Sequence, residues 1–138
     1  REYGPFGGDG RVHGVSHDGR RVWAALGTAL VAFDPASGAP LHTLQRACDA
    51  GTAFDGKHLY QIAEARIDKI DPASGQRTMR IALPNGATSI ALTREAAPRL
   101  IAMRMDGPID VLDAVSGKLV HSLGPGVAFN PTVAIPVP

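Results

Sequence analysis

The sequence contains one small group of residues that can do chemistry. Arg11, Cys48 and Asn85 recur at a constant interval of 37 residues, with His13 and Asp49 beside them. A histidine paired with a carboxylate can act as a general base or form half of a metal site. A cysteine thiol can act as a nucleophile when its pKa is lowered. These five residues are the candidate ligand-binding positions, and no catalytic role is assigned to any of them.

The constant interval belongs to a repeat that runs through the chain. Residues 14–23 are matched by residues 51–60, and residues 33–38 return as 70–75 and, after a further 42 residues, as 112–117. Short apolar runs alternate with Asp-Gly and Asp-Pro turn signals, which favours strands joined by tight turns. A period near forty residues with four such strands is typical of a β-propeller blade.

We therefore predict an all-β fold, with a single domain over residues 1–138 built from four-stranded antiparallel blades. The repeats cover approximately residues 11–47, 48–84 and 85–123, and a partial fourth unit, 124–138, restarts the pattern at Gly126. No helix longer than a turn is expected, because glycine and proline interrupt every segment. The expected strands are residues 11–17, 21–26, 29–33, 40–44, 49–54, 58–62, 66–70, 76–83, 88–93, 100–103, 109–112 and 118–123.

The number of blades poses a problem of closure. Closed propellers have typically four to eight blades, whereas this sequence supplies three and part of a fourth. We expect a partial ring with three ways to complete it: the chain is a fragment of a longer propeller, two copies pair about a twofold axis, or a partner chain supplies the missing blades. Self-association or a fragment is favoured over a stable three-blade monomer.

Composition excludes some partners and leaves the compartment open. The formal net charge is +1 and the charges are scattered without a basic run, so no nucleic-acid partner is expected. No apolar run reaches the roughly 18 residues of a membrane span, so no membrane partner is expected. The single cysteine excludes an intrachain disulfide. A chain without an intrachain disulfide is compatible with a bacterial cytoplasm or periplasm.

Residues that recur at equivalent positions are expected to serve the blade rather than a site. Trp23 and Tyr60 are equivalent, with Ile101 at the corresponding place in the third repeat. They are interpreted as packing between blades, and a stacking surface for a sugar or a quinone is the alternative. The other recurring residues are Gly14 and Gly51, Asp18 and Asp55, Asp34, Asp71 and Asp113, and His42 and His121.

Breaks in the repeat are where function is expected, because the fold does not require them. Gln61, Glu64 and Arg66 depart from the small residues of the first repeat and are placed on a loop joining two strands, where they can contact a partner. Residues 94–98 replace the Asp-Gly turn of the first two repeats with a longer loop.

The candidate site residues themselves also have structural interpretations. The start of each inner strand opens into the central channel of a propeller, where converging polar groups form a binding site. His13 and Asp49 can equally be satisfied by local hydrogen bonds. The neighbouring carboxylate of Asp49 is expected to raise the pKa of the Cys48 thiol, which does not favour a nucleophile. The alternative is that Cys48 is a small buried residue. Neither a metal-binding motif nor a phosphate-binding loop occurs, so no metal site is expected, and the sequence leaves the cofactor unknown.

Residues 51–62 and 66–75 resemble the repeats of the bacterial glutamine-cyclotransferase-like and virginiamycin-B-lyase-like β-propellers, and the broader quinoprotein-like and NHL-like repeats. The resemblance covers about residues 11–83. It implies the propeller fold, and its cyclotransferase members convert N-terminal glutamine to pyroglutamate. The matching residues belong to turns and core, and no catalytic motif of that enzyme maps onto this sequence.

Three hypotheses for function follow. The first, which we favour, is a binding or interaction scaffold of unknown ligand, because recurring residues account for most polar groups. The second is an enzyme of the cyclotransferase or lyase kind, with Arg11, His13, Asp49 and Asn85 at the channel mouth. The third is a quinone-binding or electron-transfer propeller.

Overall fold

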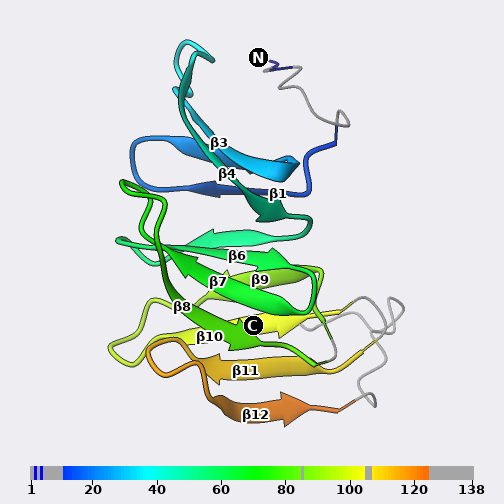
Figure 1. Ribbon diagram of the computed structural model, residues 1–138. Helices are drawn as coiled ribbons and strands as arrows, with labels where there is room; N and C mark the ends of the chain where they lie inside the picture. The colour runs from blue at the N-terminus through cyan, green and yellow to red at the C-terminus, as the bar shows by residue number, and fades with distance from the viewer. Residues whose placement is uncertain (1, 3, 5–10, 85, 105–106, 125–138) are drawn as a thin grey trace, which may run out of the picture.

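The computed structural model describes residues 2, 4, 11–84, 86–104 and 107–124 (Figure 1). These residues form twelve strands in three four-stranded antiparallel sheets, and they contain no helix. The predicted all-β fold is confirmed, and each sheet has the form of a propeller blade. The described part of the chain contains no helix long and apolar enough to cross a membrane.

Each blade is a simple meander in which sequential strands are hydrogen-bonded neighbours. Blade 1 consists of β1 (Gly14–His17), β2 (Val22–Ala25), β3 (Gly27–Phe33) and β4 (Pro40–Cys48). Blade 2 consists of β5 (Thr52–Phe54), β6 (Leu59–Ala63), β7 (Arg66–Ile70) and β8 (Arg77–Ala82). Blade 3 consists of β9 (Ser89–Leu92), β10 (Arg99–Met103), β11 (Ile109–Asp113) and β12 (Leu119–Leu123).

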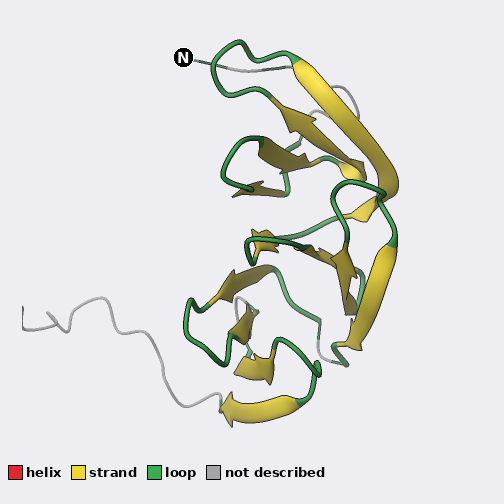
Figure 2. Cartoon of the chain, turned by 90° about the vertical axis from the view of Figure 1, so that its left-hand side faces the viewer, coloured by secondary structure: helices red, strands yellow, loops and turns green. Residues whose placement is uncertain are grey.

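The three blades stack face to face in a curved row that does not close into a ring (Figure 2). The inner strands approach closely at two recurring glycines. A Cβ at Gly14 would lie 2.9 Å from the carbonyl oxygen of Ala50, and one at Gly51 would lie 2.9 Å from the Cα of Ser89. Both contacts are with backbone, which cannot give way, so only glycine fits between adjacent inner strands.

The recurring aspartates stabilise the turns between strands three and four of each blade. Asp34, Asp71 and Asp113 each accept a hydrogen bond from the backbone N–H two residues later, at 2.8, 2.9 and 2.9 Å. Each turn ends at a glycine with positive φ, for example 78° at Gly38. These are Asx turns, in which the side chain replaces a backbone acceptor. The aspartates therefore serve the fold, as the repeat predicts.

A second recurring aspartate links the first turn of a blade to its interior. The Trp23 indole N–H donates to the Asp18 carboxylate at 2.8 Å, and the Tyr60 hydroxyl donates to Asp55 at 3.0 Å. Partial burial opposes ionisation, but hydrogen bonds from the Arg21 backbone and the Trp23 indole lower the pKa of Asp18 from 3.8 to about 2. A buried aromatic residue thus anchors each Asp-Gly turn.

Two of the three hydrophobic clusters lie between blades, and the third consists of the blade 1 residues Ala24, Leu26, Val31 and Phe33. Trp23 is fully buried and packs with blade 1 residues against Leu59 and Ile70 of blade 2. Tyr60 is 1% exposed and belongs to the cluster between blades 2 and 3. The interpretation of these two rings as inter-blade packing is confirmed. Further core residues at the blade 2–blade 3 interface are Ile62, Ile67, Ile81, Leu83, Leu100, Ala102, Leu112 and Ala114.

The structure differs from the expected strands at the end of blade 1. The outer strand β4 continues to Cys48, whereas the expected strand ends at residue 44, and the next inner strand begins at Thr52 instead of the expected Asp49. The extension forms because β3 is also longer than expected, so Gly27 remains to pair with Cys48. The loop at residues 94–98 separates β9 from β10, as expected. Most of the predicted fourth unit, residues 125–138, lies outside the described residues.

Candidate functional site

His13 and Cys48 lie on either side of the same glycine. The His13 backbone N–H donates to Ala25 at 2.8 Å, and a Cβ at Gly27 would lie 3.5 Å from its Nε2. Cys48 pairs with Gly27 across the sheet. Arg11 is exposed at the start of the same segment, and Asn85 lies outside the described residues. The structure thus brings two of the five candidates to one end of blade 1.

Cys48 is placed between the blades rather than at a channel mouth. Its side chain is fully buried, and its thiol donates to the Ala29 carbonyl at 3.1 Å. Burial raises the pKa of the Cys48 thiol, and the nearby charge of Asp49 adds to the effect. A buried thiol with a raised pKa is a poor nucleophile. Its position matches the structural interpretation.

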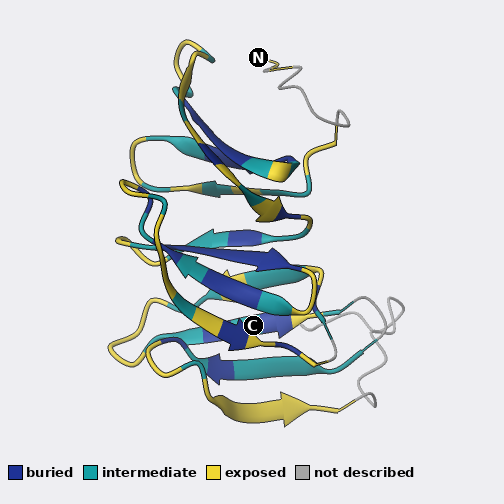
Figure 3. Cartoon of the chain, viewed as in Figure 1, coloured by how far each residue is buried: buried dark blue, intermediate teal, exposed yellow. Residues whose placement is uncertain are grey.

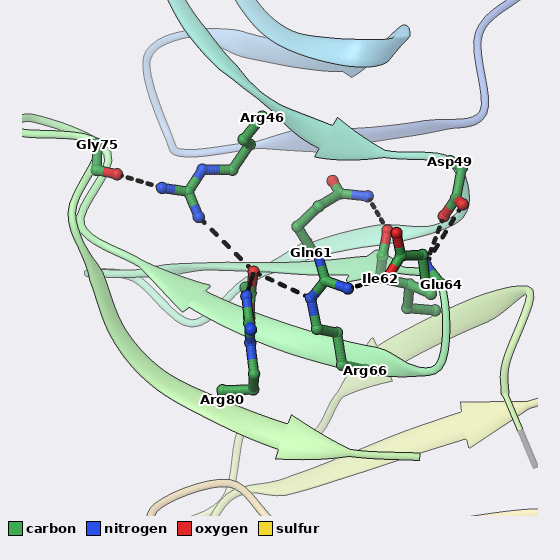
Figure 4. Close-up of polar contacts among 9 residues, drawn as sticks. Arg46, Asp49, Gln61, Ile62, Glu64, Arg66, Gly75 and Arg80 are labelled. Carbon is green, nitrogen blue, oxygen red and sulfur yellow. Dashed lines mark hydrogen bonds and ion pairs between the residues drawn. The ribbon is translucent and has the colours of Figure 1, made fainter. Parts of the chain in front are cut away.

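Asp49 is engaged with the neighbouring turn. Its two carboxylate oxygens lie 3.1 and 3.3 Å from the Glu64 backbone N–H, which donates to them (Figure 4). Glu64 adopts a φ of 54°, a left-handed conformation that is uncommon for a residue other than glycine. The carboxylate of Asp49 therefore helps to hold the strained turn between β6 and β7.

A polar cluster lies beside this turn, at the interface of blades 1 and 2 (Figure 4). Asp68 is 4% exposed and receives two hydrogen bonds from Arg80, at 2.8 and 3.1 Å. Arg46 of blade 1 and Arg66 lie 3.8 and 3.7 Å from the same carboxylate. Burial opposes ionisation, but the hydrogen bonds and charge of Arg80, with Arg66, lower the pKa of Asp68. The Asp68 carboxylate thus lies among three guanidinium groups, one of which, Arg66, is also paired with Glu64.

Gln61 extends this cluster into the core. It is fully buried in β6, and its amide N–H groups donate to the carbonyls of Ala50, Gly51 and Ile62 at 3.0, 3.3 and 2.7 Å. The prediction of a loop is wrong for Gln61 and Arg66, which lie within β6 and β7. Glu64 lies in the turn between these two strands. Gln61 and Arg66 therefore contribute polar contacts beside the interface of blades 1 and 2, whereas the Glu64 side chain is exposed and paired with Arg66.

A cavity opens at the opposite end of the inner strands. Its volume is about 860 Å³, and all three blades contribute to its walls. Blade 1 supplies the turn after β1, blade 2 the turn after β5 together with Lys69, and blade 3 the loop between β9 and β10. We call it the turn-side cavity. Its lining includes Phe54, Lys57, His58, Lys69, Arg94 and Glu95.

Sequence reasoning missed this cavity because its lining residues lie in turns that the repeat explains. One signal was present: the loop at residues 94–98 departs from the Asp-Gly turn of blades 1 and 2. Thr93 organises this loop by donating to the Glu95 carboxylate at 3.0 Å and accepting from the Arg99 N–H at 2.8 Å. In the described part of the chain, no three His, Cys, Asp or Glu side chains are placed to hold a metal ion.

Comparison with known proteins supports the fold. No protein family and no curated protein matches the sequence. The structure is similar to a chain of hydrazine synthase from Kuenenia stuttgartiensis, a β-propeller-containing protein, with a TM-score of 0.66 and 15% identity. The match covers 83% of this chain and 37% of that chain. At this identity the likeness shows a β-propeller-like fold and nothing of activity.

Proposed function

We propose that this protein is a β-propeller scaffold that acts by association, and that a second copy of the chain covers the outer face of blade 3. The proposal rests on the equivalence of Tyr60 and Ile101. Tyr60 of blade 2 is buried against the next blade, blade 3, and Ile101 occupies the same position in blade 3, where the described chain supplies no next blade. Leu100 and Ala102 point toward blade 2, so strand alternation turns Ile101 to the opposite face. That face is only partly buried (Figure 3).

The outer face of blade 3 has the composition of an inter-blade surface. Cross-strand pairing places Val111 opposite Ile101, Ile109 opposite Met103, and Leu123 opposite Ile109. Met103 and Leu123 are 37% and 41% exposed. Burying an aliphatic side chain of this size stabilises by roughly 1.5–3 kcal/mol. Covering this face is therefore favourable, and pairing of two three-blade units brings the blade number into the range of closed propellers.

Sedimentation velocity over a range of concentrations tests the proposed surface. We expect the unmodified chain to sediment as a dimer. Ile101→Glu or Val111→Glu would place a charge in the interface, and we expect either to produce a monomer that keeps its β-sheet circular dichroism. Val115→Glu is the matched control, because Val115 is 72% exposed in the turn before β12. A dimer that survives both interface variants, or an unmodified chain that is monomeric throughout, would overturn the proposal.

One observation favours a second candidate, an enzyme of the cyclotransferase- or lyase-like class that the sequence resembles. His58 Nδ1 lies 3.6 Å from the Asp55 carboxylate at the turn-side cavity, which is an arrangement suited to acid–base chemistry. The carboxylate also receives the Tyr60 hydroxyl and two backbone N–H groups. Ammonia release from a glutaminyl peptide, abolished in His58→Ala, would establish this candidate in place of the scaffold.

A further inference from the structure

The turn-side cavity has the volume of a small-molecule site and is partly open to solvent. Its volume of about 860 Å³ falls within the range of roughly 300–1,000 Å³ that ligand pockets occupy. Phe54, Leu92 and Pro98 provide apolar surface, and Phe54 is half-buried at the end of its inner strand. The three walls come from three blades, so a ligand there would be contacted from several sides.

The acidic residues of the lining already have partners. Asp18 is paired with the Arg21 side chain at 2.8 Å. Asp55 lies 3.6 Å from His58, and Glu95 accepts the Thr93 hydroxyl. These contacts orient the carboxylates, and of the three only Asp18 is paired with a guanidinium group of the described chain.

The basic residues of the lining keep their capacity. Lys57 and Arg94 are exposed at the rim, and within the described ranges of the chain no carboxylate pairs with either of them. The Lys69 ammonium lies over the Tyr60 ring, 5.4 Å from its centroid, which leaves its N–H donors available. The cationic groups of the lining that have no carboxylate partner among the described residues thus come from blades 2 and 3.

The third wall of the cavity is the loop at residues 94–98 between β9 and β10, which is longer than the equivalent turns of the other blades. Blades 1 and 2 close the same position with an Asp-Gly turn anchored by an aromatic residue. Blade 3 uses a longer loop that presents Arg94. Because the shorter turn satisfies the fold twice, the blade does not require the longer loop that brings a guanidinium to this cavity.

We propose that the turn-side cavity binds an organic anion, a carboxylate or phosphate with a compact apolar part, held by Lys57, Lys69 and Arg94 against Phe54. Guanidinium and ammonium groups make charge-assisted hydrogen bonds to either anion, and the planar Arg94 can bind in bidentate fashion. The anionic group lies between the turn after β5 and the loop before β10, with its apolar part toward the inner strands. This proposal does not depend on the association of blade 3.

Amide chemical-shift titration of the full ¹⁵N-labelled chain tests the site. The probes are phenyl phosphate, benzoate, inorganic phosphate and the uncharged benzyl alcohol. We expect phenyl phosphate or benzoate to cause saturable shifts at residues 54–58 and 93–95. Inorganic phosphate should bind more weakly because it lacks the apolar part, and benzyl alcohol should cause no saturable shift. Whichever organic anion binds more tightly identifies the preferred head group.

Paired variants distinguish the site from general surface attraction. Lys57→Met and Arg94→Met should each weaken binding of that anion roughly tenfold, which corresponds to one charge-assisted hydrogen bond. The matched controls Lys118→Met and Arg77→Met remove exposed charges outside the cavity lining and should change the affinity less than twofold. The proposal is overturned if no organic anion saturates, if benzyl alcohol binds equally well, or if the controls weaken binding as much as the site variants.

Discussion

The two interfaces between blades are built from the same repeat but by different chemistry. Between blades 2 and 3, aliphatic residues surround Tyr60 in a continuous apolar cluster. Between blades 1 and 2, the apolar part ends at Leu59 and Ile70, and the cluster around Asp68 continues the contact. An apolar interface depends on many small contributions. The polar part of the other interface is centred on one buried carboxylate, so a single substitution there is expected to have a large effect.

The largest expected effect is therefore at Asp68. Asp68→Asn keeps the shape but removes the counter-charge of Arg46 and Arg80 and leaves Arg66 paired with Glu64 alone. We expect a loss of roughly 3–4 kcal/mol in the free energy of unfolding, measured by urea denaturation. Asp110→Asn is the matched control, because Asp110 occupies the equivalent place in blade 3 and accepts a single hydrogen bond from Ser122 at 2.7 Å. Equal losses in the two variants would show that the arginine cluster has no special role.

A somewhat smaller effect is expected at the apolar interface. Ile67→Ala removes a fully buried side chain from the blade 2–blade 3 cluster, and we expect a loss of about 3 kcal/mol. The salt dependence distinguishes the two interfaces. Raising the ionic strength should reduce the loss of unfolding free energy caused by Asp68→Asn, because salt screens the repulsion among the three arginines. It should leave the loss caused by Ile67→Ala unchanged. A salt response at Ile67 would contradict the comparison.

The smallest effect is expected at the Asp18 turn, in the pH dependence of stability. The pKa of Asp18 is lowered to about 2 in the folded chain, from 3.8. Its contribution is therefore fully present above pH 4 and is lost as the pH falls from about 4 to about 2. We expect Asp18→Asn to cost about 2 kcal/mol at pH 7 and less at pH 2. Thermal unfolding of both proteins over this range measures the difference, and a constant difference would be contrary to expectation.

The arrangement of strands was predictable from the sequence because it depends on local signals. Recurring Asp-Gly and Asp-Pro turns position the strands, and the glycines at 14 and 51 mark the close approach of inner strands. The position of Cys48 was not predictable, because it depends on how far β3 and β4 remain paired, which no turn residue specifies.

The candidate site was less predictable because sites arise from residues that the repeat brings together in space. The contact between Arg46 and Asp68 joins two blades, and no sequence interval reveals it. Arg94 and Lys57 meet at one cavity for the same reason. The useful signal was the break in the repeat at residues 94–98, because it interrupts a turn that the fold uses elsewhere.

Light scattering coupled to size-exclusion chromatography tests the central claim, that a second copy covers the outer face of blade 3. The account predicts a monodisperse species of twice 14.4 kDa for the chain of 138 residues. A monodisperse species of 14.4 kDa at all concentrations would contradict it, because the apolar face of blade 3 would then be stable without a partner.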